Sequence, residues 1–233
     1  MIPRILFLIP ARKGSKGLPN KNIKPFGKTT LIELAIDNAR QCARKDDIIC
    51  LSTNDELAID LAERRGIMVP FVRPDNLADD TTSMEKVIRH AINYYYKKGE
   101  VFDCIVLLQP TSPLRSSRDI DAVIELYDGT QEMIVTVNKA KENPYFNIYE
   151  ESDKGKLIKS KSGKFTNRQS LPNCFTLNGA VYLLPITTLE KKSIHQISML
   201  DKVEIPVTRS IDIDTQDDWD LALYYFNKIN EDS

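Results

Sequence analysis

Strand-like and helix-like segments alternate along the first 138 residues, and this alternation restricts the fold more than any other feature of the sequence. Strand-like apolar runs lie at residues 4–9, 47–53, 103–109 and 132–138. Apolar residues at helical spacing separate these runs, at residues 31–40, 55–66, 83–99 and 117–128. This order predicts an α/β fold with a mostly parallel sheet and helices on both of its faces. Ligands of such sheets bind outside the carboxyl ends of the strands.

A polar segment interrupts this order after Asn138. Residues 139–176 are rich in lysine and broken by glycine and proline, and their polar–apolar alternation favours a projecting hairpin. The regular pattern then returns, with two strand-like segments and one helix-like segment at residues 179–184, 203–207 and 217–229. We therefore expect one α/β domain built from residues 1–138 and 177–233, with residues 139–176 inserted as a small subdomain.

Charge and cysteine usage exclude several classes of protein. The 233 residues include 32 Lys and Arg against 33 Asp and Glu, so a basic patch must be local and nucleic acid is not expected as a partner. Four scattered cysteines without a CxxC spacing favour free thiols of a cytoplasmic protein over a disulfide or zinc framework. The apolar run at the start is too short for a signal peptide, and no stretch reaches membrane-spanning length.

The loop ARKGSKGLPNKN, residues 11–22, concentrates positive charge directly after the first strand. Its glycines allow close approach of the backbone, and its N–H groups and lysines suit an anion with several charges. Neither GxxxxGK[ST] nor GxGxxG is present, so the loop is not a P-loop or a dinucleotide fingerprint. A solvated surface turn is the alternative interpretation.

Five blocks of sequence resemble the acylneuraminate cytidylyltransferases, which make CMP-sialic acids. The blocks are IPARKGSKGLPNKNIKPFGKTTLIELAI, VRPDNLADDTTS, LLQPTSPLR, NRQSLPNCFTLNGAVYLL and SIDIDTQDDWDLA. They occur in the family's order, from the first strand to the last helix. The resemblance implies a three-layer, Rossmann-like nucleotidyltransferase fold. It also implies an Mg²⁺-dependent reaction that joins CTP to the anomeric hydroxyl of an acidic keto-sugar and releases pyrophosphate.

The resemblance assigns nucleotide-binding roles along the first half of the chain. The residues that match the family's triphosphate loop are Arg12, Ser15, Lys16, Lys21 and Asn22. Arg12 is expected to grip the phosphates, because its planar fork can bond two oxygens at once. Arg73 matches the residue near cytosine, although a surface arginine paired with Asp75 is the alternative. Thr81 and Thr82 are expected to complete the base pocket, where Met84 replaces a small polar residue.

The resemblance also assigns residues to the acidic sugar. Gln109, after the most apolar strand, corresponds to the family's sugar-contacting glutamine. Arg168 and Gln169 match a pair that meets the sugar, and an arginine suits a carboxylate, with a solvated cation as the alternative. Asn178 and Tyr182 are expected to line the same cleft, although Tyr182 also suits the core.

The stretch IDIDT places Asp212 and Asp214 two residues apart, so in an extended segment both carboxylates point the same way. Mg²⁺ is usually held by one or two carboxylates together with substrate phosphates. We therefore expect these two aspartates to bind Mg²⁺, and expect Arg12, Lys21 and Asp214 to serve catalysis. Thr215 and Asp218 resemble a capping pair, and together with Asp217 they are expected to start the last helix.

Three questions about function remain open at the level of sequence. In the family the polar insertion mediates a swapped dimer, so a homodimer is expected through residues 139–176. The stretch NPYFN, residues 143–147, resembles the legionaminate-type branch, which leaves legionaminic acid or Kdo as alternatives to sialic acid. A nucleotide- or sugar-binding protein without turnover is the alternative of another class, against which Arg12, Lys21, Asp212 and Asp214 argue.

Overall fold

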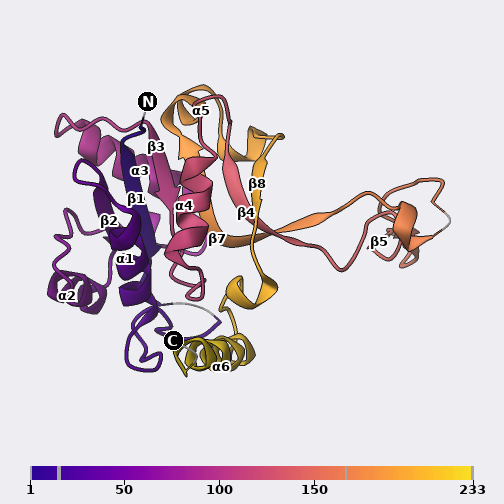
Figure 1. The fold of residues 1–233 in the computed structure, drawn as a ribbon, viewed down its shortest axis with the longest axis horizontal. Coiled ribbons are helices and arrows are strands. Elements are labelled where there is room, and N and C mark those ends of the chain that lie inside the picture. Colours follow the sequence, from indigo (N-terminus) through magenta and orange to yellow (C-terminus); the bar gives the residue numbers. More distant parts are fainter. Residues whose placement is uncertain (1, 15–16, 166, 232–233) are drawn as a thin grey trace.

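The computed structural model describes residues 2–14, 17–165 and 167–231. Within them, six strands form one sheet in the order β2-β1-β3-β7-β4-β8, and β5 and β6 form a separate hairpin (Figure 1). The strands are β1 Ile5–Ala11, β2 Ile48–Thr53, β3 Cys104–Leu107, β4 Ile134–Lys139, β5 Tyr149–Glu151, β6 Leu157–Lys159, β7 Phe175–Pro185 and β8 Asp201–Glu204. The α-helices are α1 Leu31–Cys42, α2 Glu56–Arg64, α3 Met84–Tyr96, α4 Ser117–Glu125, α5 Ile186–Lys191 and α6 Gln216–Glu231.

The sheet is mostly parallel, as the sequence predicts. Strand β1 pairs in parallel with β2 and β3, and β4 pairs in parallel with β8. Strand β7 runs antiparallel between β3 and β4, because the chain re-enters the sheet there after its excursion beyond β4. The carboxyl ends of β1, β2, β3 and β4 consequently share one edge of the sheet.

Alternate residues of β1 divide the core into two layers. Ile5, Phe7 and Ile9 pack with apolar residues of α1, α2 and α4 on one face of the sheet. Leu6 and Leu8 pack on the other face with α3 and α5. Every residue of β1 is buried, which is the burial that its continuous apolar sequence predicts for a central strand. Helices therefore cover both faces, and the fold has three layers.

A third apolar cluster attaches α6 to residues 11–22, here called the cationic loop, and to the segment that follows them. The ring of Trp219 lies edge-to-face on Phe26, with ring centroids 5.1 Å apart, and Leu18 and Leu31 pack beside them. Such aromatic pairs stabilise a contact beyond the apolar area that they bury. The cluster holds residues 17–31 against the C-terminal helix, which fixes one wall of the loop.

Strand β7 contains an irregularity opposite β4. The pairing register shifts between Val135 and Val137, and Gly179 adopts a φ of +74°, which disfavours residues with a Cβ. Asn178 stabilises this bulge from within. Its Oδ1 accepts bonds from Thr136 Oγ1 at 2.7 Å and from the Ala180 N–H at 3.2 Å.

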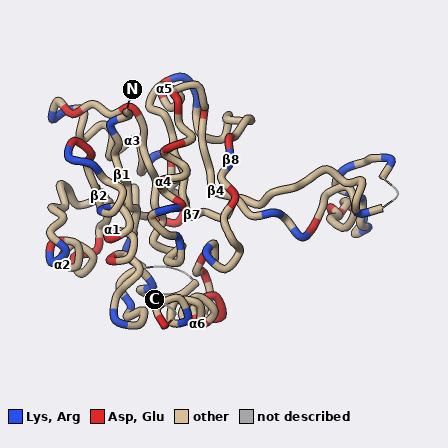
Figure 2. The backbone as a smooth tube through the Cα atoms, viewed as in Figure 1, with Lys and Arg blue, Asp and Glu red and all other residues tan. Residues whose placement is uncertain are grey.

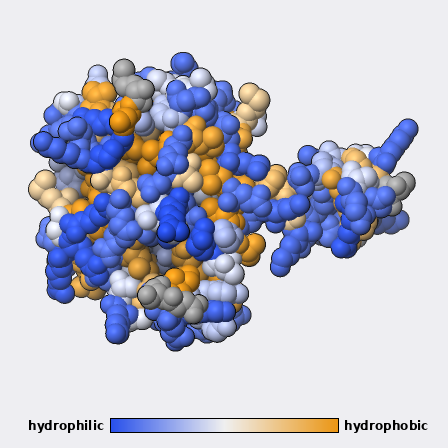
Figure 3. All heavy atoms as spheres, in the orientation of Figure 1, coloured by the Kyte–Doolittle hydropathy of each residue, from blue (hydrophilic) through white to orange (hydrophobic). Residues whose placement is uncertain are grey.

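Residues 140–174, here called the arm, project away from the sheet as a separate lobe (Figures 1 and 3). A backbone hydrogen bond from Ala140 N–H to the Cys174 carbonyl, at 2.9 Å, closes its base. The arm exposes the apolar side chains of Phe146, Tyr149, Leu157 and Ile158. Both signs of charge are mixed over the arm, which carries several lysines, and over the body (Figure 2). In the described part of the chain, no helix is long and apolar enough to span a membrane.

Candidate active site

A cleft of about 310 Å³ opens at the carboxyl edge of the sheet, around the ends of β1 and β3. Loops that are distant in the sequence meet there, since the parallel strands deliver their carboxyl ends to one place. The predicted site residues that line this cleft are Arg12, Lys21, Asn22, Arg73, Thr82, Gln109 and Asp214. The walls are completed by Asp79, Asp80, Met84 and Thr111, among others.

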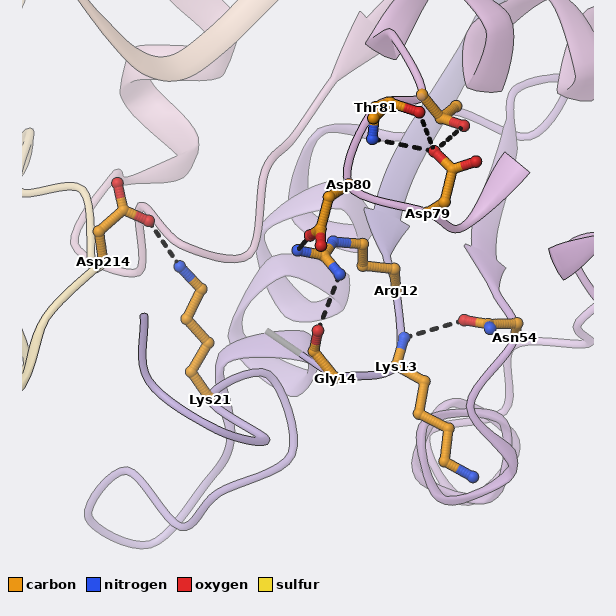
Figure 4. A network of polar contacts seen from close by, with 10 residues as sticks. Arg12, Lys13, Gly14, Lys21, Asn54, Asp79, Asp80, Thr81 and Asp214 are labelled. Carbon is orange, nitrogen blue, oxygen red and sulfur yellow. Dashed lines mark hydrogen bonds and ion pairs between the residues drawn. The ribbon is translucent and has the colours of Figure 1, made fainter. Parts of the chain in front are cut away.

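Arg12 lies at the mouth of the cationic loop, immediately after β1 (Figure 4). Its Nη1 donates to the Gly14 carbonyl at 2.8 Å, and its Nη2 lies 2.5 Å from the Asp80 carboxylate. Gly14 has a φ of +70°, which turns the backbone back toward the guanidinium. Ser15 and Lys16, which the sequence assigns to the triphosphate, lie outside the described residues.

Lys21 is buried and joins the cationic loop to the segment before α6. Its Nζ donates to the Ile213 carbonyl at 2.5 Å and to Asp214 Oδ1 at 2.7 Å (Figure 4). The Asp214 side chain is 73% exposed and lines the cleft. Gly17 makes this approach possible, because a Cβ there would lie 2.1 Å from the Asp214 carbonyl oxygen. Asn22 is also buried, and its Oδ1 has no hydrogen-bond partner among the described residues.

Arg73 lies on the floor of the cleft, next to the end of β2. It is only 4% exposed, and its Nε donates to Ser52 Oγ at 3.0 Å while Nη2 donates to the Ser52 carbonyl. Burial penalises its charged form and lowers its pKa to about 10. The alternative of a surface arginine is therefore wrong for Arg73. Asp75 instead accepts a bond from Asn54 Nδ2 at 3.2 Å.

The loop of residues 79–82 forms the opposite wall. Asp79 Oδ1 accepts bonds from the hydroxyls of Thr82, at 2.8 Å, and Thr81, at 2.9 Å. These hydroxyl bonds hold the pKa of Asp79 below its ordinary value. Both threonine hydroxyls thus stabilise their own loop, and a contact of Thr81 or Thr82 with a base stays a prediction. Met84, at the start of α3, adds an apolar surface there.

Gln109, Asp212 and Ser112 converge over the β7 bulge, beside the cleft. A Cβ at Gly179 would lie 3.7 Å from Asp212 Oδ2 and 3.8 Å from both Gln109 Oε1 and Ser112 Oγ. Burial raises the pKa of Asp212, a hydrogen bond from Thr111 opposes that rise, and the nearby charge of Asp214 adds to it. The pKa of the Tyr182 phenol on β7 is raised by burial and by the nearby charge of Asp212.

Asn178 lies within the β7 bulge. Its amide is buried in the bulge, where Nδ2 donates to Asn138 Oδ1 at 3.1 Å and Oδ1 accepts the bonds from Thr136 and Ala180. Each polar atom of the side chain therefore already has a protein partner. A direct contact of Asn178 with sugar remains a prediction, and the observed contacts stabilise the strand.

Arg168 and Gln169 lie on the arm, apart from the cleft. They line a separate pocket near its base, together with Asn143, Phe146 and other arm residues. The Arg168 guanidinium carbon lies 4.9 Å from the centroid of the Phe146 ring, a cation–π geometry. A single chain does not bring this pair to Gln109 and Asp212.

The residues around the start of α6 separate into two groups. Thr215 N–H donates to Asp218 Oδ2 at 2.8 Å, and Asp218 N–H donates to Thr215 Oγ1 at 3.2 Å, which is the predicted capping pair. The side chains of Asp212 and Asp214 take no part in this cap. Among the described residues, no group of three or more His, Cys, Asp and Glu could hold a metal. Two exposed carboxylates two positions apart nevertheless fit Mg²⁺ that takes its remaining ligands from phosphates and water.

Comparison with known proteins agrees with this arrangement of loops around the sheet edge. The family model described as cytidylyltransferase matches residues 6–196. The chain belongs to the cytidylyltransferase family. The resemblance seen in the five sequence blocks is therefore confirmed at the level of the family.

Relatives and solved structures give the same family and fold. The "Post-translational flagellin modification protein B" of Campylobacter coli is 39% identical over 183 residues, which cover 77% of this chain and 76% of that protein. The "CMP-N,N'-diacetyllegionaminic acid synthase" of Legionella pneumophila is 31% identical over 224 residues, 94% of each chain. A CMP:2-keto-3-deoxy-manno-octonic acid synthetase complexed with CTP matches with a TM-score of 0.70 over 97% of this chain and 99% of its own. At 14% identity, this last likeness shows the nucleotidyltransferase fold alone.

Two residues of the site, Asp80 and Ser52, are not predicted from the sequence. Asp80, the partner of Arg12, carries a charge opposite to the one expected beside a triphosphate, so no local pattern marked it. Ser52 holds Arg73 from the end of β2, but a serine in an apolar strand gives no distinctive signal. Both contacts join segments that only the folded sheet brings together.

Proposed function

We propose that this cytidylyltransferase joins CTP to the anomeric hydroxyl of a nonulosonic acid, giving a CMP-sugar and pyrophosphate. The observation that carries the proposal is the cleft at the carboxyl edge of the sheet. Arg12, Lys21, Arg73 and Asp214 all line it. Nucleotidyl transfer depends mainly on positioning and on neutralising the charge of the phosphates, and this set of groups is suited to both.

The triphosphate is assigned to the cationic loop. Arg12 offers a fork for two phosphate oxygens, and the buried Lys21 offers a compact charge that its bonds to Ile213 and Asp214 hold in place. In the cleft these cations would balance the charge that develops on the leaving pyrophosphate.

The base is assigned to Arg73 and the wall of residues 79–82. A buried guanidinium fixed by Ser52 cannot reorient freely, so its remaining N–H groups favour a base that presents acceptors at set positions. Cytosine presents a carbonyl oxygen and an acceptor ring nitrogen side by side, whereas the same ring nitrogen of uracil carries a hydrogen. We therefore expect a preference for CTP over UTP of about tenfold in kcat/KM.

Mg²⁺ is assigned to Asp212 and Asp214. When bound, the ion would neutralise phosphate charge and help to orient the α-phosphate. Asp214 would also keep Lys21 in place through their contact at 2.7 Å. Gln109 and Tyr182, which lie beside Asp212, would orient the sugar next to the phosphorus.

The sugar carboxylate is assigned to Arg168, supplied by the arm of a second subunit. The arm exposes apolar side chains that its own lobe does not cover, and its sugar-binding candidates lie apart from the cleft of their own chain. A homodimer in which each arm reaches the partner's cleft would cover the exposed apolar side chains and bring Arg168 to a cleft. A light-scattering mass near the 26.6 kDa of one chain at working concentrations would count against this assembly.

Among nonulosonic acids we place the diacylated legionaminic type first and the neuraminic type second. The NPYFN stretch and the name of the Legionella relative both support this order. The phenyl ring of Phe146 beside Arg168 offers an apolar surface to a methyl group of the sugar. Kdo, an eight-carbon acid outside the nonulosonic class, stays as the alternative to both. The four cysteines are free thiols, which is typical of a reducing compartment, and we propose the cytoplasm as the place of the reaction.

One assay tests the proposal. Pyrophosphate release is measured with CTP, UTP and ATP, each combined with legionaminic acid, neuraminic acid, Kdo and a neutral hexose. We expect release only when CTP meets a nonulosonic acid. Equal turnover of CTP and UTP would contradict the assignment of Arg73. Nucleotide binding without release for every sugar would favour the non-catalytic alternative.

A further inference from the structure

The loop that carries Gln109 is fixed by a buried arginine from its own end. Arg115 is 2% exposed, and its Nη1 donates to the Gln109 carbonyl at 2.6 Å and to the Ala180 carbonyl at 2.9 Å. The first carbonyl belongs to the loop after β3, and the second belongs to β7 directly after the bulge. One nitrogen atom thus joins the two segments on which the sugar-side groups of the site are built.

The other edge of the same guanidinium has no partner in the part of the chain that the structure describes. Nε and Nη2 of Arg115 are buried, and neither has a hydrogen-bond partner among the described residues. These two N–H groups form the fork that matches a carboxylate. The carboxylates whose charges act on Arg115 are Asp212, first, and Asp119. Asp119 is already bonded to Arg209, at 2.8 Å, and to Ser116, at 2.8 Å, whereas Asp212 acts on Arg115 through its charge.

The positions around Gly179 connect these groups geometrically. Asp212 Oδ2, Gln109 Oε1 and Ser112 Oγ each lie within 3.8 Å of the place where a Cβ of Gly179 would stand. Ser112 Oγ is also buried without a partner among the described residues. Three side chains from two segments therefore surround the open face of the bulge, and one of them, Asp212, is the carboxylate whose charge acts most on Arg115.

We propose that Arg115 is a positioning residue for the transfer reaction, holding Gln109 and Asp212 in fixed relation beneath the sugar without touching substrate. The inference rests on the proposed function, since it needs a sugar and a metal ion at these two side chains. Its physical reason is the cost of the arrangement. A buried cation with two unsatisfied donors is unfavourable for stability, and an apolar side chain of similar size would serve the core better. A role in positioning the site residues explains why a charged arginine occupies this buried position.

The test compares Arg115→Lys and Arg115→Met with Arg65→Met as the matched control. Lysine can reach the two carbonyls with one ammonium group but cannot supply the second edge of the fork. Arg65 bonds to Glu33 at 3.1 Å and to Asp37 on the side of α1 and α2, away from the cleft. Each variant is measured for its CTP dissociation constant by calorimetry, for its half-saturating Mg²⁺ concentration in that binding, and for kcat and KM of the sugar.

For both Arg115 variants we expect kcat/KM of the sugar to fall by about tenfold or more and half-saturating Mg²⁺ to rise by about fivefold, with the CTP constant within about twofold. Arg65→Met should leave all of these quantities within about twofold of the unmodified enzyme. A loss of CTP affinity as large as the loss for the sugar would overturn the proposal. So would full recovery of sugar kinetics in Arg115→Lys, because carbonyl bonding alone would then suffice.

A measurement on the unmodified chain covers the case in which the variants do not fold. The Ser112 amide donates to the Gln109 carbonyl at 3.2 Å, the same carbonyl that Arg115 holds. We expect amide exchange at Ser112 to be slowed by about a hundredfold or more relative to an unstructured peptide. Exchange at the unstructured rate would overturn the proposal. If the unmodified enzyme turns over no acidic sugar, the proposed function fails, whereas Ser112 exchange and the Mg²⁺ response still decide the role of Arg115.

Discussion

The ion pair between Arg12 and Asp80 places a carboxylate on the guanidinium that is expected to bind the triphosphate. A phosphate oxygen that approaches Arg12 meets this carboxylate and is repelled by it. Binding of CTP must therefore displace Asp80 or accept its negative charge nearby. We expect Asp80→Asn, which keeps the size of the side chain and removes its charge, to tighten the binding of CTP.

The structure sets the magnitude of this effect. The side chains of Arg12 and Asp80 are 29% and 34% exposed, so water and salt screen their 2.5 Å contact substantially. Pairs of this kind contribute about 0.2–1 kcal/mol. Release of that interaction corresponds to binding that is tighter by about 1.4-fold to fivefold. The gain should shrink as the salt concentration rises, since the exposed part of the interaction is screened.

Calorimetry with CTP at two salt concentrations measures the change, and Asp79→Asn provides the matched control. Asp79 lies in the same loop and lines the same cleft, but its carboxylate accepts hydrogen bonds from Thr81 and Thr82. We expect a smaller change in affinity for this control. Weaker CTP binding by Asp80→Asn would refute the reasoning, because Asp80 would then orient Arg12 for the phosphates instead of competing with them.

Three further outcomes are expected. Arg168→Met should lower kcat/KM for the acidic sugar by about tenfold with little change in CTP affinity, as measured by steady-state kinetics, and the reverse pattern would assign Arg168 to the triphosphate. Trp219→Ala should lower the free energy of unfolding in urea by about 3–5 kcal/mol, because the indole is buried against Phe26, and a loss below about 1 kcal/mol would contradict that packing. Burial raises the pKa of Cys50 and of Cys104 to about 12, so neither should react with a thiol reagent at pH 8 until urea unfolds the chain, and rapid labelling of either in the native protein would contradict the structure.

Local patterns in the sequence predict the elements of this fold more fully than their pairing. The apolar run of β1 and the spacing of α1 depend on neighbouring residues, and the Thr215–Asp218 cap is itself a local contact. The antiparallel direction of β7 depends on the path of the chain through the arm, which no local pattern records. Strand β3 also ends earlier than its apolar run suggests, at Leu107, because the chain turns there into the loop that Arg115 holds.

Site residues could be predicted from the sequence where they lie in a loop that directly follows a strand. Lys21 and Arg12 follow β1 directly, so their arrival at the sheet edge follows from the topology. In the sequence Asn178 suits a cleft residue and a residue that supports a bulge equally well, and its bonds to Thr136 and Asn138 depend on a register shift that no local pattern reveals. The distance of Arg168 from the cleft depends on the length and direction of the whole arm.

The closure of the arm at its base has a consequence for divergence within the family. The chain leaves the sheet after β4 and returns to the neighbouring strand β7, and the bond from Ala140 to Cys174 joins the points of exit and return. An excursion with adjacent ends can gain, lose or exchange residues while the strands beneath it stay in register. The sequence and length of the arm can therefore change during evolution while the residues at the carboxyl edge of the sheet stay the same.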